Sequence, residues 1–593
     1  MSSIKVEKKW QLMPKITKES IKKYPGYNPV ILQLLYNRGL TEKNEIESFL
    51  NPGDNIMNDP FLFRNMGKAL DLIISHIKNK NKIVVYGDYD ADGVTSSTIL
   101  VETLNVLKAD SDVYIPNRVT EGYGLNKGAI EIIKKMGAKL IITVDGGIRN
   151  KEEVEYAKIL GLDVIITDHH TPSDDENNLP DCLIINPLVK NESYPFKQLA
   201  GVGVAFKLAK ALIGKAKITD EEKRKLEDRM YDLVAIGTVS DCVTVLGENR
   251  YFIKRGLEIL NQKKRKGLNE LIKIAQVSGA KRLDSWNIGF QIGPRLNAAG
   301  RLEHANTSFE LLITKNENDA EEIARKLNER NSERQKITEE IMAEVEAQIN
   351  PEDKILIGVC PEDYETEAWK EGVIGLVAGK ISDKYYRPAL VITRSENGMK
   401  GSGRSIEEFN LIRAIDEASE FLTRYGGHPA ACGFSLLPEN LDGFVKKIKE
   451  IANMKLKGVE LKPKIIIETE IGLEEINEEL FGEIEKFGPF GNDNNRPVFV
   501  SKGTIVDKIF MGAEGQHVKF KLKNEKSGLL SAIGFGQSEN FKDFQIGDTI
   551  DIVYYLDLNE FNGRREIQLK ILDSKASRQT PFFLNLQNVG ERV

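Results

Sequence analysis

The sequence predicts a multidomain protein of the α/β class, and three observations lead to this prediction. The chain has 593 residues, which is too long for one hydrophobic core. Short β-branched runs alternate with helical patterns in its first half, which predicts βαβ units around a buried parallel sheet. Its C-terminal part changes to alternating polar and apolar positions, which predict antiparallel strands. We therefore expect a parallel-sheet domain, a smaller α/β domain and a C-terminal β-barrel.

The elements of the two α/β domains follow in order along the chain. Buried strands of the first domain, residues 66–315, are expected at Lys82 to Tyr86, Leu140 to Val144, Val164 to Thr167 and Leu183 to Ile185. Residues 316–350 are charged, lack Pro and Gly, and place apolar residues at helical spacing, which predicts one long connecting helix. The second domain, residues 351–458, has strand patterns near Ile355 to Val359 and Ala389 to Ile392.

Residues 459–576 carry the antiparallel pattern. His517 to Leu522 alternates, and Thr549 to Leu558 runs through Asn562 and Gly563, a strong hairpin signal, into a further alternating segment. This pattern predicts a small barrel of the OB type. Residues 1–65 and 577–593 are expected to be an N-terminal extension and a C-terminal tail.

Composition sets the broad class. Hydrophobic residues make up 41% of the chain, enough to fold most of it, and a net charge of −6 neither favours nor excludes nucleic-acid binding. No segment has the apolar length of a signal peptide or a membrane span, so we expect a cytoplasmic protein without a membrane anchor. The four cysteines are scattered without a CxxC pair, which predicts neither a zinc cluster nor disulfides.

Three aspartates follow the first buried strand. Asp88, Asp90 and Asp92 lie in the stretch YGDYDADGVTSS, and carboxylates this close repel one another unless cations hold them. The carboxyl edge of a parallel sheet is also where such folds bind ligands. The pattern DxDxDG also opens an EF-hand calcium loop. That loop needs Glu at its twelfth position, where this chain has Ile99, and it follows a helix and not a strand.

Further polar residues follow the next strands. Asp145 comes directly after one apolar run, and Asp168, His169 and His170 come after another. Imidazole beside carboxylates favours Mn²⁺ or a related transition ion over Ca²⁺. Asp241, at the end of a later apolar run, would complete the set, although a lone aspartate there is more often a helix cap.

The combined motifs identify a family resemblance. DYDADG, NR followed by EGYG, VDGG, TDHH, TVSD, GPRLNAAGR and GGHPAACGF occur in this order. Together they resemble the RecJ branch of the DHH/DHHA1 phosphoesterases, from about Trp10 to the C-terminal barrel. The resemblance implies that the first domain is a DHH catalytic domain, the second a DHHA1 substrate-binding domain and the barrel a nucleic-acid-binding OB domain.

The resemblance also implies a metal centre. Two Mn²⁺ or Mg²⁺ ions would be held by Asp88, Asp90, Asp92, Asp145, His169 or His170, and Asp241, with Asp145 bridging the pair. Asp168 would support the histidines without touching a metal. The sequence does not decide which imidazole binds metal.

Substrate-binding residues are expected outside the metal centre. Glycine-rich loops let backbone N–H groups approach phosphates, and Arg adds a bidentate charged fork. On this basis and by resemblance, the candidates are Arg295, Asn297, Arg301, Ser402, Arg404, Ser405 and His428. In the barrel, the aromatics Phe510, Phe520, Tyr554, Tyr555 and Phe561 are either stacking residues or barrel core.

The resemblance implies a single-stranded-DNA-specific exonuclease of 5′→3′ polarity, active in DNA repair and recombination. Single-strand-binding protein and a RecQ-type helicase would be its partners, and a monomer is expected. One alternative is a phosphodiesterase for short oligonucleotides, RNA or cyclic dinucleotides, for which the barrel has little use. Another is a non-catalytic scaffold, which the complete set of acidic residues and histidines opposes.

Overall fold

The computed structural model describes residues 7–118, 120–275, 282–361, 368–396, 398–524, 526, 528–561 and 564–577. The chain forms two compact units. The larger unit comprises residues 52–461 with 489–494, and the smaller unit comprises residues 1–51, 462–488 and 495–593. In the described part of the chain no helix is both long and apolar enough to cross a bilayer.

The first sheet of the larger unit is a five-stranded parallel sheet of order β3-β2-β4-β5-β6. Its strands are β2 (Lys82–Gly87), β3 (Ser111–Tyr114), β4 (Ala138–Val144), β5 (Asp163–Thr167) and β6 (Leu183–Ile185). The four predicted strands are therefore confirmed, and the short edge strand β3 is added. Gly87 is opposite Val144, which is opposite Thr167, so β2, β4 and β5 end side by side.

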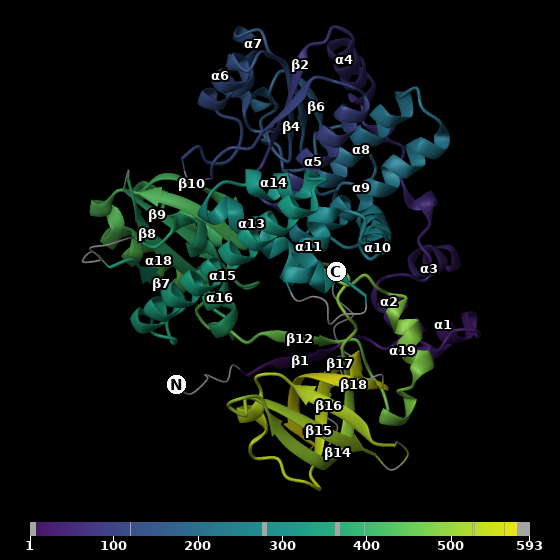
Figure 1. The fold of residues 1–593 in the computed structure, drawn as a ribbon. Coiled ribbons are helices and arrows are strands. Elements are labelled where there is room, and N and C mark those ends of the chain that lie inside the picture. The colour runs from purple at the N-terminus through teal and green to yellow at the C-terminus, as the bar shows by residue number, and fades with distance from the viewer. Residues whose placement is uncertain are drawn as a thin grey trace, which may run out of the picture. The chain divides into compact units, whose positions relative to one another are not determined.

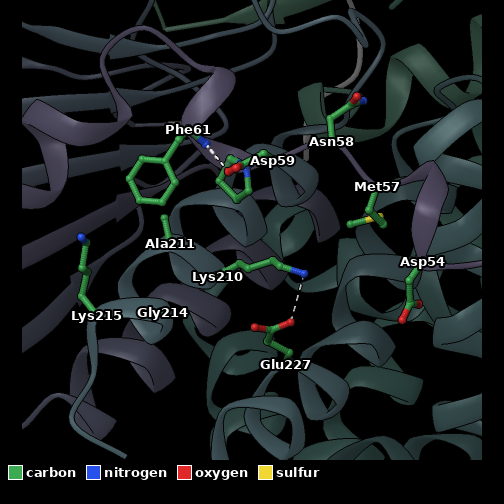
Figure 2. A pocket seen from close by; sticks show the side chains of 11 residues that line it. Asp54, Met57, Asn58, Asp59, Phe61, Lys210, Ala211, Gly214, Lys215 and Glu227 are labelled. Carbon is green, nitrogen blue, oxygen red and sulfur yellow. Dashed lines mark hydrogen bonds and ion pairs between the residues drawn. The ribbon is translucent and has the colours of Figure 1, made fainter. Parts of the chain in front are cut away.

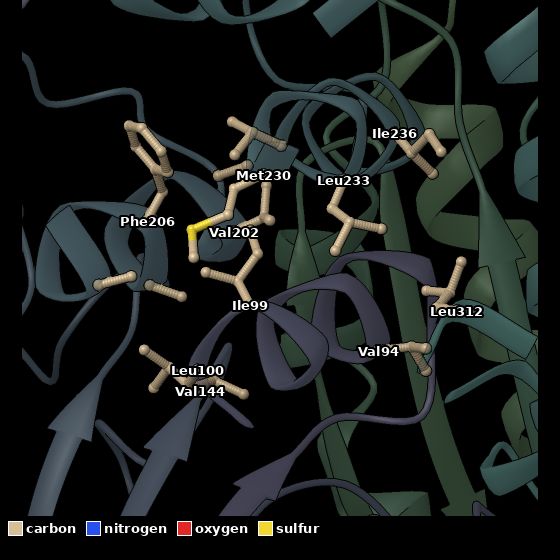
Figure 3. Packing of buried hydrophobic residues seen from close by; sticks show 14 of the residues in the cluster. Val94, Ile99, Leu100, Val144, Val202, Phe206, Met230, Leu233, Ile236 and Leu312 are labelled. Atoms are coloured by element: carbon tan, nitrogen blue, oxygen red, sulfur yellow. The ribbon is translucent and has the colours of Figure 1, made fainter. Parts of the chain in front are cut away.

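Helices cover both faces of this sheet (Figure 1). Alternate residues such as Val85 and Ile142 pack with α4 (Met66–Lys78), α5 (Ala91–Val106) and α8 (Gly201–Lys215), whereas Val84 and Ile141 pack with α6 (Lys127–Lys135) and α7 (Lys151–Ile159). Figure 3 shows the first of these cores, in which Ile99 of α5 and Phe206 of α8 meet Met230 of α9 (Asp220–Ser240). The result is a rigid three-layer base for the strand ends.

A helical region joins this sheet to the second one. It contains α10 (Gly247–Leu260), α11 (Lys266–Ile274), α12 (Ser285–Asn287), the π-helix η5 (Ile288–Ile292), α13 (Gly293–Leu302) and α14 (Asn306–Ile313). The long helix α15 (Glu317–Gln348) follows and confirms the predicted connecting helix. It packs against α11, α13 and α14 before it reaches α16 (Glu371–Tyr385).

The second sheet has the order β10-β11-β9-β8-β7. Its strands are β7 (Leu356–Val359), β8 (Ala389–Ser395), β9 (Gly398–Arg404), β10 (Leu422–His428) and β11 (Ala431–Leu436). Only β7 and β8 pair in parallel. One face packs on α15 and α16, and the other on α17 (Leu411–Asp416) and α18 (Leu441–Lys455). The two predicted strands are confirmed within a mixed α/β domain.

The smaller unit contains a closed barrel of β14 (Phe499–Met511), β15 (His517–Lys523), β16 (Leu530–Gly534), β17 (Thr549–Phe561) and β18 (Arg564–Ala576). Pairing of β14 with β17 closes it, which confirms the predicted OB-like barrel. The predicted turn at Asn562 and Gly563 and the side chain of Phe561 lie outside the described residues. From the other end of the chain, β1 (Lys9–Leu12) pairs with β12 (Lys464–Ile467).

Candidate active site

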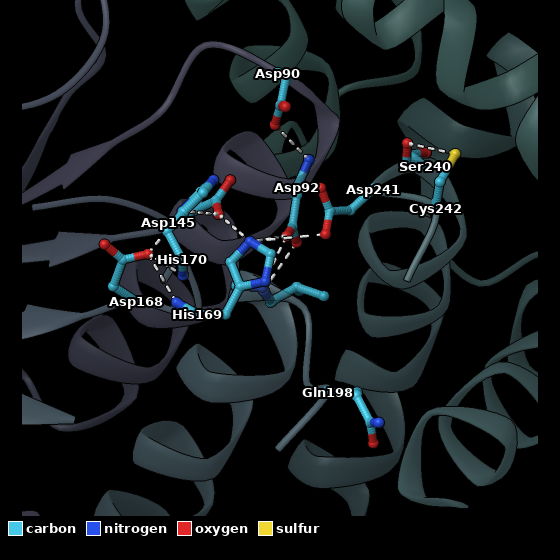
Figure 4. A network of polar contacts seen from close by, with 12 residues as sticks. Asp90, Asp92, Asp145, Asp168, His169, His170, Gln198, Ser240, Asp241 and Cys242 are labelled. Carbon is cyan, nitrogen blue, oxygen red and sulfur yellow. Dashed lines mark hydrogen bonds and ion pairs between the residues drawn. The ribbon is translucent and has the colours of Figure 1, made fainter. Parts of the chain in front are cut away.

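Polar side chains meet where β2, β4 and β5 end. Asp88, Asp145 and Asp168 each follow a strand end, and the aligned register brings them to one edge of the sheet. All three are buried. Figure 4 shows this edge, with Asp241 facing it from the end of α9. The predicted acidic constellation is thus brought together in space.

The backbone at Asp145 has an unusual conformation. Its φ of 57° lies in the left-handed region, which is uncommon for residues other than glycine. A methyl group on Gly201 would come within 2.5 Å of Asp145 Oδ1, so α8 approaches this carboxylate as closely as a glycine allows. Strained backbone held by close packing is typical of functional sites.

Helix starts fix two of the three clustered aspartates. Asp90 is the N-cap of α5, and its Oδ1 accepts hydrogen bonds from the N–H groups of Asp92 and Gly93. Asp92 accepts from the N–H groups of Gly201 and Val202 at the start of α8, at 2.7 and 2.8 Å. The positive ends of these helix dipoles stabilise the carboxylates, and the hydrogen bonds orient them.

The two histidines have different surroundings. Nδ1 of His170 donates to Asp168 Oδ1 at 2.8 Å, and that carboxylate also accepts from the N–H groups of His169, His170 and Ile148. Nε2 of His169 is 3.2 Å from Asp145 Oδ1 and 3.6 Å from Asp241 Oδ2. Asp168 is therefore fully occupied by hydrogen bonds, whereas His169 points into the carboxylate cluster.

The cluster carries excess negative charge. Burial, together with repulsion from neighbouring aspartates, raises the pKa of Asp92 to about 7 and of Asp241 to about 9, and the same causes raise the pKa of Asp88 and Asp145. Burial lowers the pKa of His169 to about 4, so it is neutral at pH 7. His170 is also disfavoured as a cation by burial, but its bond to Asp168 raises its pKa to about 9.

Three buried atoms of the cluster make no hydrogen bond to any described residue. They are Asp88 Oδ1, Asp145 Oδ1 and His169 Nε2. A buried polar atom without a hydrogen-bond partner costs folding free energy, and each of these three atoms is of a kind that binds metal ions in proteins. Carboxylate oxygens with one neutral imidazole are a donor set suited to Mn²⁺ or Mg²⁺. The residues therefore fit divalent cations.

The potential ligand atoms form overlapping groups. Asp88, Asp90 and Asp145 bring oxygens within 4.8 Å of one another, as do Asp92, His169 and Asp241 with their ligand atoms. Asp145 also groups with His169 and His170. Asp145 is thus adjacent to both sets, which is the position of a carboxylate shared by two ions.

Two of the predicted substrate-binding residues have structural contacts. Asn297 Oδ1 accepts from the N–H of Ala91 at 2.7 Å, which fixes the start of α5 beside the metal cluster. Arg295 donates to Asn328 of α15 and to the carbonyl of Gln291. Both side chains hold neighbouring elements together, and the charge of Arg295 also acts on Arg334.

Arg301 and Arg404 belong to a cluster of arginines. Burial and the neighbouring charges of Arg118, Arg334 and Arg404 together lower the pKa of Arg301 to about 9. Burial and the charge of Arg118 also lower the pKa of Arg404. Nε of Arg334 is buried without a hydrogen-bond partner among the described residues. We call Arg118, Arg301, Arg334 and Arg404 the arginine cluster.

The arginine cluster lies beside the acidic edge and the second domain. Asp90 is close enough to Arg301, and Asp88 to Arg118, for their charges to interact. Arg301 donates to the carbonyl of Gly372 in the first turn of α16 at 2.9 Å. Arg118 and Arg334 were not among the predicted residues. Arg118 follows Asn117 in the NR motif, whereas nothing in the charged sequence of α15 distinguishes Arg334.

The remaining predicted residues lie on or near β9 and β10. Ser402 Oγ is 3.4 Å from Arg404 Nη1, so these two side chains are neighbours. Ser405 Oγ donates to the carbonyl of Phe409 and stabilises a turn. His428 is exposed. It pairs with Ala431 on β11, and Ala431 pairs with Arg404 on β9. Two strand spacings of about 4.8 Å therefore separate His428 from Arg404.

The aromatic residues of the barrel divide into core and surface. Phe520 and Tyr554 are buried core residues, and Tyr555 is half-buried. Phe510 is 45% exposed beneath Lys508 Nζ, and Phe535, which was not predicted, is 56% exposed beneath Lys570 Nζ. Exposed aromatics with cations are the composition of a surface that stacks bases.

A cavity of about 540 Å³ lies away from the acidic edge, between the segment around Met57 and the end of α8 (Figure 2). Among its charged lining residues, Lys210 pairs with Glu227 at 3.2 Å and Lys215 lies over the Phe61 ring. It contributes no residue to the acidic edge.

Comparisons with known proteins agree with this division of the chain. Residues 82–238 match the DHH family N-terminal domain, residues 352–454 the DHHA1 domain and residues 467–573 the RecJ OB domain. The single-stranded-DNA-specific exonuclease RecJ of Bacillus subtilis is 40% identical over 95% of this chain and 70% of its own length.

Solved structures of RecJ from Thermus thermophilus show the same fold. The complex with Mn²⁺ has a TM-score of 0.80 at 25% identity, over 96% of this chain and 80% of that chain. The complex with Mg²⁺ has a TM-score of 0.75 at 24% identity, over 96% and 79%. The chain belongs to the RecJ family of DHH/DHHA1 phosphoesterases.

Proposed function

We propose that this protein is an exonuclease that hydrolyses single-stranded DNA from the 5′ end with the help of two divalent cations, Mn²⁺ or Mg²⁺. The observation that carries the proposal is the placement of Asp145 between two groups of ligand atoms, with its Oδ1 free of hydrogen bonds to described residues. The relatives that share all three domains are single-stranded-DNA-specific exonucleases by name.

In this proposal one cation is held by Asp88, Asp90 and Asp145, and the other by Asp92, Asp145, His169 and Asp241. When bound, such a pair activates water and stabilises charge on the attacking and leaving oxygens of a phosphodiester. The hydrogen bond from His170 to Asp168 supports a role in which these two residues hold the loop that presents His169. His170 Nδ1 is 3.9 Å from Asp145, so its ring lies next to the ligands.

The arginine cluster is the proposed phosphate site. Arg404 and Arg301 supply planar charged forks, and Ser402 adds a hydroxyl beside Arg404. Burial, followed by the charge of neighbouring arginines, lowers the pKa values of Arg301 and Arg404, and a bound phosphate would offset both effects. The other proposed substrate-binding residues also have structural contacts or lie nearby: Arg295 and Asn297 hold α13 and α5, Ser405 bonds within the turn after β9, and His428 is exposed two strands from Arg404.

The barrel supports a polynucleotide substrate over the alternative of a cyclic dinucleotide or short oligonucleotide. It matches the RecJ OB domain, and Phe510 and Phe535 expose aromatic faces beside lysines. Stacking on such faces holds single strands without sequence preference. By family membership we further propose action in DNA repair and recombination, in the cytoplasm, as a monomer, with single-strand-binding protein and a RecQ-type helicase as partners.

The test is digestion of one strand labelled at either end, prepared as DNA and as RNA, with Mn²⁺, Mg²⁺ or a chelator. The proposal predicts release of label from the 5′ end of DNA first, with a metal only. Release from the 3′ end would contradict the polarity, and faster loss of RNA would contradict the substrate. Activity in the chelator would contradict the metal dependence.

A further inference from the structure

Two large aromatic side chains stand exposed on one turn of helix in the larger unit. Trp286 in α12 is 55% exposed and Phe290 in η5 is 68% exposed. Their rings stack with centroids 5.4 Å apart and an interplanar angle of 24°. Ile288 and Ile292 of the same helical stretch are fully buried. The segment therefore has its own core contact, and the aromatic pair is additional apolar surface that faces solvent.

The pair lies beside the proposed metal centre. A methyl group on Gly293 would come within 2.5 Å of Ser240 Oγ, and one on Gly289 within 3.5 Å of a Val239 methyl, so η5 packs on the end of α9. Asp241, a proposed metal ligand, is the C-cap of that helix. The aromatic segment is thus in contact with the turn that presents a metal ligand.

The same helix continues to the other side of the site. η5 leads without interruption into α13, where Asn297 accepts the Ala91 N–H next to the aspartate cluster. Seven residues separate Phe290 from Asn297, which is about 10 Å at 1.5 Å per residue. A π-helical turn changes the direction of the side chains that follow it, and such turns are frequent at functional sites.

Several polar groups near the pair are hydrogen-bonded within the protein. Asp284 caps the start of α12 through the N–H of Asn287, and Asn287 donates to Gln291. Ser285 Oγ donates to the carbonyl of Phe490. Arg282, four residues before Trp286 in the sequence, is exposed. Exposed aromatic faces of this kind fit a nucleobase.

We propose that Trp286 and Phe290 form a stacking platform for an unpaired base of the strand whose phosphate lies at the metal centre. The proposal rests on the proposed function, which it deepens. Every base has a π-face, so the platform accepts any sequence. In a duplex both faces of a base are covered by its neighbours, so the platform also favours single strands over duplexes.

The test uses the full chain with Asp145→Asn, which should not cut, and a fluorescent single-stranded DNA oligomer, with every variant compared in this same background. In this background, Trp286→Ala with Phe290→Ala should weaken binding roughly 5- to 160-fold, the range that corresponds to one lost stacked base. The matched control is Phe61→Ala, which removes another exposed aromatic of the same unit, at the remote cavity, and should leave binding unchanged.

Two further readouts report stacking itself. Of the three tryptophans, Trp369 is buried, Trp10 is half-buried and Trp286 is exposed, so Trp286 is the most accessible fluorophore and DNA should quench its emission. A single abasic position in the oligomer should weaken binding by the unsubstituted chain but not by the double variant. Trp286→Phe should retain most of the affinity, because it keeps an aromatic face, and near-UV circular dichroism checks the fold of each variant.

The outcomes separate the platform from the proposed function. If the wild-type chain does not digest single-stranded DNA, the proposed function fails. If it does, but the double variant binds as tightly as Phe61→Ala, the platform is refuted while the nuclease stands. Loss of binding without any quenching of Trp286 or any abasic effect would also refute stacking, and would assign the surface to another contact.

Discussion

The acidic edge and the arginine cluster are two regions of one unit with opposite electrostatics. In the first, burial and the charges of neighbouring carboxylates raise the pKa of Asp241 to about 9. In the second, burial and the charges of neighbouring guanidinium groups lower the pKa of Arg301 to about 9. Each region alone costs folding free energy, because like charges are buried together. The comparison supports the proposal that each region binds a ligand of opposite charge, namely cations in the first and phosphate in the second.

The most severe disruption should come from Asp145, which lies between both groups of ligand atoms. We expect Asp145→Ala to reduce hydrolysis by at least about 10²- to 10³-fold, the range for removing one group that stabilises developing charge. Without metal, the same variant should melt at a higher temperature than wild type, because one repelling carboxylate is gone. Steady-state hydrolysis and thermal melts in a chelator measure both effects. Asp181→Ala, at an exposed aspartate paired with Lys158, is the control and should change neither.

Removing Arg404 tests the opposite region. We expect Arg404→Ala to lower kcat/KM by a factor equivalent to about 1.5 to 3 kcal/mol, because a charge-assisted contact to phosphate is lost. Mn²⁺ affinity, measured by calorimetry, should stay unchanged. Arg413→Ala, at an exposed arginine of the same domain, serves as the control. Loss of Mn²⁺ binding in Arg404→Ala would show that this arginine organises the acidic edge.

The stability of the metal-free protein should fall as pH rises from 6.5 to 9. Asp92, with its pKa raised to about 7, Asp241, raised to about 9, and His170, raised to about 9, all bind protons more tightly folded than unfolded. Stability from such groups is present at low pH and disappears as pH passes their folded pKa values. Each proton of difference contributes a slope of up to about 1.4 kcal/mol per pH unit.

The folded pKa of His169 is lowered to about 4, from an unfolded value of 6.5. Between these two pH values the ionisation of His169 makes stability rise with pH, which is opposite to the effect of the other three groups. Urea titrations across this range, with chelator and with Mn²⁺, measure the effect. Saturating Mn²⁺ should flatten the dependence. If the free energy of unfolding in the chelator rises with pH over this range, the account of carboxylates that repel one another in the metal-free cluster is contradicted.

The smallest effect is expected in the barrel, where we propose that single strands bind by stacking on aromatic side chains and not through a cluster of like charges. Phe535→Ala should weaken binding of long single strands about fivefold, the lower end for one stacking contact. The dependence of log affinity on log salt should keep its slope, since no phosphate contact is removed. Leu529→Ala, at an exposed aliphatic residue of the same barrel, is the control. A changed slope would mean that Phe535 acts by positioning Lys570.

The fold was predictable where sequence patterns are strong. The strands that end at Asp88, Asp145 and Asp168 are continuous β-branched runs, and the long helix α15 has uninterrupted helical spacing. The edge strand β3 is too short and half-buried to stand out. The pairing of β1 with β12 joins segments more than 400 residues apart, and local patterns carry no information on it.

The site was predictable at strand ends and unpredictable where function depends on three-dimensional neighbours. The sequence left open which histidine binds metal; the structure favours His169, because Asp168 occupies His170. Arg334 looks like any charged residue of a solvated helix, and its place in the arginine cluster follows only from the packing of α13 on α15. The bonds of Ser405 and Arg295 to backbone carbonyls of the protein's own chain are likewise not indicated by the sequence.

The number of Mn²⁺ ions bound per chain tests the central claim most directly. Equilibrium dialysis of the full chain at neutral pH should give two tightly bound ions, and Asp145→Asn should weaken the binding of both, because this carboxylate is proposed to be shared. Asp181→Ala should still bind two. A wild-type chain that binds no Mn²⁺, or an Asp145→Asn variant with unchanged stoichiometry and affinity, would contradict the account.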